Sequence, residues 1–280
     1  MEIGIFSKTF DYPTLTEKLD AIVAHGLHAI QFNMDCAGLE SMPDQIDPAL
    51  CATIRQEMAA RGIKMATVSG TYNMVDPDLA QRRCGLQRLR TLAAACHDMG
   101  TSIITLCTGT RDRTSMWRRH PDNDLPDAMR DLVAELRQAV VFAEEYKVTL
   151  AFEPEVNNVI DSARKARQLL DEIGSPYLKV VMDGANIFHT GELPRMRAIL
   201  DEAFALLGND IALAHAKDLD HDGDAGHLAA GHGLLDYAHY LRLLQQAGYN
   251  GTLILHGLDE SQVAGCVAFL QEKLGQSAPA

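Results

Sequence analysis

The chain has 280 residues, of which 47% are hydrophobic and 22% charged, a composition typical of a soluble globular protein. Acidic side chains outnumber basic ones by 38 to 25, and the resulting formal charge of −13 disfavours binding to the phosphates of a nucleic acid. The sequence contains no apolar run of about 18 residues and no signal-like N-terminus, so we expect a cytoplasmic protein without membrane partners.

Short β-rich runs alternate with longer amphipathic segments along the whole chain. The amphipathic segments carry apolar residues at helical spacing, as in residues 79–99 and 127–146, and several of them end at a glycine. The β-rich runs are residues 2–6, 28–32, 63–68, 102–107, 148–153, 178–183, 211–216 and 252–256.

This alternation of eight strands with helices predicts an α/β fold, namely a single (β/α)8 TIM barrel. We expect the barrel to span residues 1–274 and to be followed by a short tail at 275–280. No GxGxxG or GxxxxGK[ST] motif occurs, so nothing indicates a nucleotide cofactor. Since catalytic groups of such barrels lie at the C-terminal ends of the strands, those ends are the places to search.

The ends of the last four predicted strands are rich in residues that bind metal ions. They carry Glu153, Asp183, His215 and His256. Two carboxylates and two imidazoles are a suitable ligand set for one divalent cation, with Mn²⁺ favoured and Co²⁺, Zn²⁺, Fe²⁺ or Mg²⁺ as alternatives. A single strand-end aspartate is more often a cap, and a single histidine more often a core residue, so the prediction depends on the four occurring together.

Two further charged residues follow these predicted ligands at strand spacing. Glu155 lies two positions after Glu153, and Lys217 two positions after His215, so each pair points to the same side of its strand. We expect Glu155 and Glu153 to be catalytic, with Glu155 as general base, and Lys217 to stabilise an oxyanion. A salt bridge of Lys217 with Asp218 or Glu155 is the structural alternative. Position alone makes four more residues candidate substrate contacts: Asn33, Tyr72, Arg111 and Asn186.

Four segments carry a resemblance to a known family: FEPEVNN, VVMDGANIFHTGEL, LAHAKDLD and AAGHGLLDYAHYLRLLQQAGYNGTLILHG. They resemble the xylose-isomerase-like TIM-barrel superfamily, and within it the sugar-phosphate isomerase/epimerase group. The resemblance implies a carbohydrate substrate and a possible homo-oligomer. It also implies metal-ligand positions for Glu153, Asp183 and His215, and a turn after the seventh strand formed by Gly231, Gly233 and Asp236.

Two departures from the family pattern affect the expected reaction. The family's epimerases carry a glutamate where this chain has His256 and usually a histidine where it has Asn186. Without the second glutamate, an epimerisation that uses two carboxylate bases loses one of them. We therefore expect isomerisation of a small sugar, sugar phosphate or keto-sugar through a metal-stabilised enediolate. A dehydratase of a cyclic keto-polyol and a 3-epimerase are the alternatives.

Two interpretations from other functional classes remain. A barrel that binds sugar without catalysis fits the missing glutamate. A DNA-repair endonuclease of the same superfamily would need histidines after strands three and four and an Asp-x-His after strand seven, and the segments VSGTYNM, LCTGTRD and LDHDGDAGHLAAGHG lack them. Histidines in the segment 221–232 could bind a second metal, although exposed histidines usually bind none.

Overall fold

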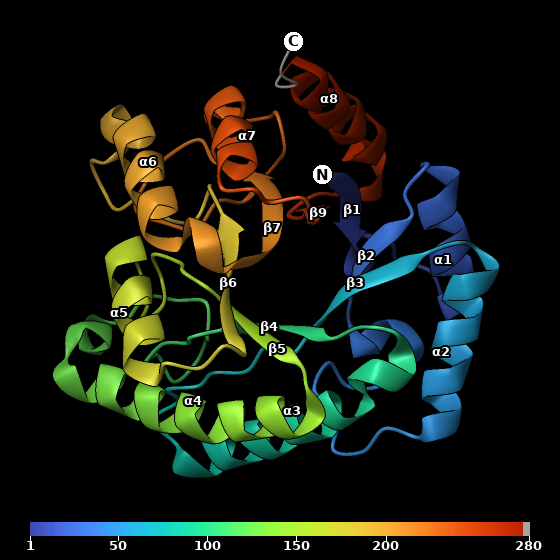
Figure 1. Cartoon of the computed structure of the whole chain (residues 1–280), viewed down its shortest axis with the longest axis horizontal. Coiled ribbons are helices and arrows are strands. Elements are labelled where there is room, and N and C mark those ends of the chain that lie inside the picture. The colour runs from blue at the N-terminus through green and yellow to red at the C-terminus, as the bar shows by residue number, and fades with distance from the viewer. Residues whose placement is uncertain (277–280) are drawn as a thin grey trace.

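The computed structural model describes residues 1–276 and shows strands enclosed by a ring of helices (Figure 1). Its parallel strands are β1 (Glu2–Phe6), β2 (Ala29–Phe32), β3 (Lys64–Ser69), β4 (Ile103–Cys107), β5 (Thr149–Glu153), β6 (Leu178–Asp183), β7 (Ile211–Asp218) and β9 (Thr252–Leu255). The α-helices are α1 (Leu15–Ala24), α2 (Pro48–Ala60), α3 (Leu79–Met99), α4 (Pro126–Tyr146), α5 (Ala163–Ile173), α6 (Met196–Leu207), α7 (Tyr237–Gln246) and α8 (Val263–Gln276).

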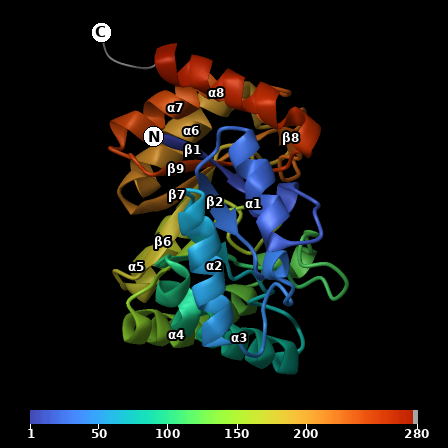
Figure 2. The ribbon, with the colours of Figure 1, turned by 90° about the vertical axis from the view of Figure 1, so that its right-hand side faces the viewer.

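Pairing between the strands closes the sheet into a barrel. The hydrogen-bonded order runs from β6 through β5, β4, β3, β2, β1 and β9 to β7, and β6 pairs with β7 to complete the ring. The first strand lies beside the last, β9, near α8 (Figure 2). The predicted single (β/α)8 barrel is confirmed.

Two details differ from the sequence-based expectation. A short strand, β8 (Leu228–Ala229), pairs antiparallel with the end of β7 at the rim of the barrel and was not predicted. Helix α8 continues to Gln276, so residues 275–276 of the predicted tail belong to it, and the remaining residues of that tail lie outside the described part. Among residues 1–276, none of the helices combines the length and the apolar character that a membrane crossing requires.

Polar caps and glycines determine where several helices begin and end. Thr14 and Glu17 form a capping box at the start of α1, and Asp78 accepts the Ala80 N–H at the start of α3. Helix α3 ends at Gly100, whose φ of 99° requires the left-handed conformation that glycine adopts without strain. Local chemistry thus sets the ends of α3 where the apolar pattern predicts them.

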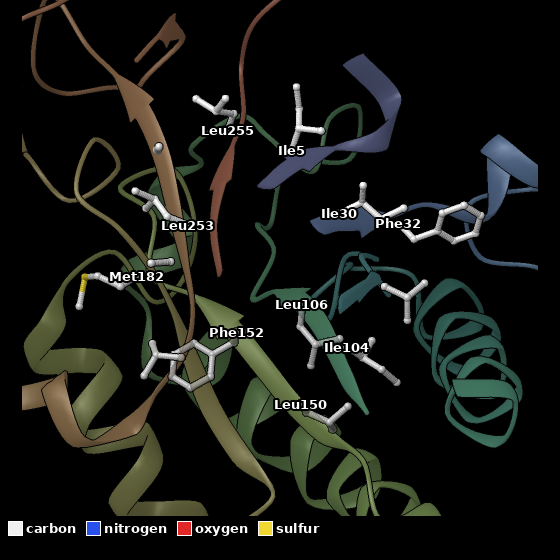
Figure 3. Packing of buried hydrophobic residues seen from close by; sticks show 14 of the residues in the cluster. Ile5, Ile30, Phe32, Ile104, Leu106, Leu150, Phe152, Met182, Leu253 and Leu255 are labelled. Carbon is white, nitrogen blue, oxygen red and sulfur yellow. The ribbon is translucent and has the colours of Figure 1, made fainter. Parts of the chain in front are cut away.

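Alternate residues of each strand face the helices or the barrel interior. The outward residues, such as Ile104, Leu150 and Phe152, belong to the main hydrophobic core between strands and helices (Figure 3). A second, smaller core fills the interior and consists of Ala66, Ala151, Val181, Leu213 and Ile254.

The small interior core explains why the predicted metal ligands point inward. Four of its members precede the four predicted ligands by two positions in the chain, which is one full period of a strand. The side chains of Glu153, Asp183, His215 and His256 therefore point into the barrel interior, toward the C-terminal ends of the strands. Strand alternation and the closed barrel together place these four side chains next to the small apolar core of the interior.

Candidate functional site

Three acidic and imidazole side chains from adjacent strands converge inside the barrel. Glu153, Asp183 and His215 each offer a ligand atom, and these atoms all lie within 4.8 Å of one another. His215 Nδ1 is 3.6 Å from Glu153 Oε2 and 3.8 Å from Asp183 Oδ2. Because metal–ligand bonds of roughly 2.0–2.2 Å separate the ligands of a tetrahedral ion by about 3.3–3.6 Å, these separations are close to those around one cation.

Unsatisfied polar atoms in this group support a cation between the three side chains. Asp183 Oδ2 and His215 Nδ1 are buried, and neither has a hydrogen-bond partner among the described residues. Buried polar atoms are normally satisfied, and a cation bound by both atoms would satisfy them. The donor set therefore fits a divalent ion, as the sequence predicts.

Two amide side chains, those of Gln31 and Asn186, form hydrogen bonds that orient the proposed ligands His215 and Glu153. The Nε2–H of His215 donates to Gln31 Oε1 over 2.9 Å, which leaves Nδ1 as the nitrogen that faces the carboxylates. The Gln31 amide in turn donates to Ser69 Oγ over 3.0 Å. Asn186 Nδ2 donates to Glu153 Oε1 over 2.5 Å. Gln31 is absent from the predicted site residues, although its polar side chain in the apolar run HAIQF is a signal that could have identified it.

Replacing Gln31 by leucine is expected to lower the affinity for a divalent cation by about 10–100-fold, because His215 loses the acceptor that fixes its tautomer. Competition against a chromophoric chelator measures this change. Gln87→Leu, at an exposed position of α3, is the matched control and should retain the parent affinity. Parent-like affinity of Gln31→Leu would show that this hydrogen bond does not matter for binding.

His256 occupies a different level of the barrel from His215. The register of β7 and β9 pairs His215 with Ile254, so His256 lies level with Lys217. Its ring stacks on His215 with a centroid distance of 5.2 Å and an interplanar angle of 2°, and on Phe6 at 5.2 Å. Burial, reinforced by the charges of Lys217 and His215, lowers the pKa of His256 well below its usual value. The three-residue group excludes His256, whose role as a fourth ligand stays a prediction.

Glu155 is a buried carboxyl group at the wall of the site. Burial, followed by the charge of Glu153, raises the pKa of Glu155 to about 8. Asn158 Nδ2 donates to Glu155 Oε1 over 3.1 Å and holds the carboxyl group in place. A carboxyl group whose pKa lies near neutrality can both accept and release a proton.

Lys217 is buried and pairs with the metal-ligand group. Its Nζ lies 3.4 Å from Asp183 Oδ2. Although burial lowers the pKa of Lys217, the charges of Asp183 and Glu153 raise it above its usual value, so the side chain is cationic. Its partner is therefore Asp183. Asp218, one of the two residues that the sequence offers as a partner, accepts hydrogen bonds from backbone N–H groups instead.

A cavity of about 620 Å³ opens above these residues at the C-terminal ends of the strands. It is lined by five of the predicted ligand and catalytic residues and by one predicted substrate contact, Asn33. Apolar side chains that sequence reasoning did not select form part of its wall: Phe6, Leu106, Met116 and Trp117. A cavity of this size and mixed lining suits a small polar molecule.

The structure does not bring the other predicted substrate contacts to this cavity. Arg111 donates to Asp131 Oδ2 over 2.7 Å, and the Tyr72 hydroxyl donates to Glu135 Oε1 over 3.0 Å. Both acceptors lie on α4, which holds these two side chains outside the cavity lining. Asn186 is fully buried, and its hydrogen bond to Glu153 gives it a positioning role.

A second group of potential ligands lies on the loop after β7. Asp220, His221 and His227 also offer ligand atoms within 4.8 Å of one another, but all three side chains are exposed. His221 Nδ1 and Asp220 Oδ1 already form a hydrogen bond of 2.5 Å. The buried group, whose polar atoms lack partners, is the stronger metal site.

Metal affinity is expected to rise with pH. Burial lowers the pKa of His215, but the charges of Glu153 and Asp183 outweigh burial and raise this pKa to about 9. Below that pH, His215 carries a proton that a cation must displace, so affinity should rise about tenfold per pH unit and level off above about pH 9. Chelator competition across this range measures the slope, and a flat profile would contradict the protonated state of His215.

Comparison with known proteins gives one family and several structural neighbours. The model of the family described as xylose isomerase-like TIM barrel matches residues 19–272. The structure resembles a D-tagatose 3-epimerase-like protein, with 15% identity, a TM-score of 0.79, and coverage of 99% of this chain and 98% of the other. It also resembles 3-keto-D-glucoside 4-epimerase YcjR from E. coli, with 19% identity, a TM-score of 0.70, and coverage of 97% and 99%.

A third neighbour is the IOLI protein, which was solved with a bound zinc atom. It shares 13% identity and a TM-score of 0.75, and the match covers 100% of both chains. At these identities the likeness to solved structures establishes the fold.

Proposed function

The chain belongs to the xylose isomerase-like TIM barrel family, and from that premise we propose that it is a divalent-metal-dependent isomerase of a small sugar, sugar phosphate or keto-sugar. The observation that carries this proposal is the buried group of Glu153, Asp183 and His215, two of whose ligand atoms lack partners among the described residues. Neighbours named as epimerases, and one with bound zinc, support a carbohydrate substrate and a metal-binding site. The mixed nitrogen and oxygen ligand set favours Mn²⁺.

Glu153, Asp183 and His215 would hold a divalent cation, which would supply positive charge to adjacent hydroxyl and carbonyl oxygens of a substrate. Glu155 removes the proton from the hydroxyl-bearing carbon beside the carbonyl group and returns it to the former carbonyl carbon, while the hydroxyl proton passes to the former carbonyl oxygen, so that the hydroxyl and carbonyl functions exchange positions. Lys217, which lines the same cavity, donates a hydrogen bond to the oxygen on which negative charge develops.

The environment of Glu155 suits this proton transfer. Its pKa of about 8 lies close to neutrality, and a bound cation nearby would lower this pKa toward the range of an effective base. Asn158 restricts the orientation of its carboxyl group. The apolar wall formed in part by Met116 and Trp117 limits the access of water to the reacting atoms.

One observation favours 3-epimerisation as a second candidate function. Nδ1 of His256 is buried without a hydrogen-bond partner among the described residues, and its lowered pKa keeps the imidazole neutral. A neutral imidazole that lines the cavity could exchange a proton with the substrate from a different direction than Glu155 does. It would replace the second glutamate of the family's epimerases.

The test is a hydrogen-exchange screen of the metal-loaded protein in D₂O with small ketoses, keto-acids and keto-inositols. We expect deuterium to enter the carbon beside the carbonyl group of the substrate, and NMR of the product distinguishes an isomer from an epimer. Water loss into an enone would appear as new ultraviolet absorbance and would indicate the dehydratase. Stoichiometric metal together with sugar binding but no exchange on any compound would instead indicate a non-catalytic sugar-binding protein.

A further inference from the structure

We propose that the substrate is an uncharged polyhydroxy carbonyl compound, a free sugar or keto-polyol, and not its phosphate ester. This inference rests on the proposed function and narrows its substrate class. It follows from three features of the cavity: the pairing of its cations, the direction of the nearby arginines, and the hydrogen bonds of the loop after β7.

The cationic side chains that line the cavity are already paired. Lys217 lies beside Asp183, and Lys8 Nζ is 2.9 Å from Asp35 Oδ2. Three carboxylate side chains line the same cavity, namely Glu153, Glu155 and Asp224. A phosphate dianion would thus find no unpaired lysine in this space, and its contacts with the carboxylates of Glu153 and Asp224 would be unfavourable.

The arginine-rich segment after β4 does not supply a phosphate-binding group to the cavity. Each of three arginines binds a carboxylate of the protein: Arg111 binds Asp131, Arg118 contacts Asp112, and Arg119 binds Asp124. The fourth, Arg113, lines a separate outer cavity of about 670 Å³ together with Arg111 and Arg118. The cavity lining above the metal ligands contains none of these four side chains.

Four backbone N–H groups after β7 donate to carboxylates of the protein. In (β/α)8 barrels a phosphate commonly binds to the loops after the seventh and eighth strands, at the N-terminus of a helix. Here the Asp218 carboxylate accepts hydrogen bonds over 2.9, 3.0 and 2.9 Å from the N–H groups of Leu219, Gly231 and Leu235. At the start of α7, Asp236 accepts from the His239 N–H over 3.0 Å.

The packing of this loop leaves no room for a phosphate beside Asp218. A Cβ atom at Gly233 would lie 2.5 Å from Asp218 Oδ1 and 2.3 Å from the carbonyl oxygen of Leu219, which is too close even for a methyl group. A carboxylate of the protein itself therefore occupies the anion position that this turn creates.

The neutral polar side chains of the cavity suit hydroxyl groups. They are Gln31, Asn33, Ser41, Ser69, Thr71, Thr105 and Asn157. Amide and hydroxyl groups can both donate and accept hydrogen bonds, as sugar hydroxyls do, whereas the phosphate group of an ester is mainly an acceptor at neutral pH. Together with the apolar wall, this lining matches an uncharged polyhydroxy compound.

The experiment compares matched pairs of a free ketose and its terminal phosphate ester with the metal-loaded protein. Isothermal titration measures binding, and exchange in D₂O measures turnover. We expect the ester to bind at least about tenfold more weakly than the free sugar, because its phosphate group meets the carboxylate of Asp224 and finds no unpaired lysine in the cavity. Asp224→Asn should reduce this difference in affinity between ester and free sugar. Asp98→Asn is the control and should leave the difference unchanged, because Asp98 is exposed on α3 at the other end of the barrel.

Equal or tighter binding of the ester would overturn the inference, and loss of that binding in Lys8→Gln would identify the side chain responsible. Faster exchange of the ester would overturn the inference but leave the proposed isomerase intact. Preferential binding of free sugars without exchange would support the inference and contradict the proposed function. Failure of both members of every pair to bind would overturn both.

Discussion

Asp183→Asn is expected to abolish the retention of a divalent cation. The carboxylate is fully buried, its Oδ2 lacks a hydrogen-bond partner among the described residues, and it faces His215 at 3.8 Å. A neutral amide oxygen contributes no charge to the site and is a much weaker ligand, so the loss should exceed the roughly 10–100-fold effect of an outer-shell change. Elemental analysis after gel filtration measures the retained metal.

The amide is preferable to alanine for this experiment. It keeps the acceptor for the Ala185 N–H, which now donates to Asp183 Oδ1 over 2.9 Å. Both substitutions remove the negative charge beside Lys217, and breaking a buried pair in this way typically costs about 3–5 kcal/mol, but only the amide keeps an oxygen that can accept a hydrogen bond from Lys217. Asp98→Asn is the control, and circular dichroism checks that each variant is folded. Stoichiometric metal in folded Asp183→Asn would rule out the proposed centre.

Glu155→Gln is expected to bind metal normally and to lose exchange of the substrate proton. Glutamine retains the shape and an acceptor for Asn158 but cannot take up a proton, so the exchange rate should fall by about 10²–10⁴-fold. The substitution should also preserve folding. With its pKa raised to about 8, Glu155 is mostly uncharged at neutral pH in the metal-free protein, and glutamine resembles that state.

Elemental analysis and D₂O exchange on the same preparation separate these two effects. Glu144→Gln, at an exposed position of α4, is a control of identical chemistry and should behave as the parent protein. Exchange at the parent rate in Glu155→Gln would show that Glu155 is not the base. His256→Gln would then test the neutral imidazole as the alternative base.

Much of the fold could be predicted because the apolar patterns of the sequence end at the same residues as the strands and helices of the barrel. The bounds of β6 and α3 match the expected residues, since the apolar run and the helical stripe both end where polar or glycine residues begin. Strand β7 extends two residues beyond the expectation because Lys217 and Asp218 pair with β8. That pairing depends on a loop folding back, which periodicity does not encode.

Site residues could be predicted where the direction of the side chain follows from strand alternation. They could not be predicted where that direction depends on a hydrogen-bond partner far away in the sequence. Glu153, Asp183 and His215 point inward because residues two positions earlier belong to the interior core. Arg111 and Tyr72 also follow strands, but a position after a strand fixes only the backbone. Acidic residues of α4 determine where these two side chains point.

The hydrogen bond between Gln31 and His215 joins residues 184 positions apart and connects β2 to β7, which are not neighbours in the barrel. The three proposed ligands come from β5, β6 and β7, whereas the group that selects the histidine tautomer comes from the N-terminal part of the chain. A fragment of the C-terminal half would thus carry every ligand yet lack this orienting contact. Tight binding at the proposed metal site would consequently require the complete barrel, to which both halves of the chain contribute.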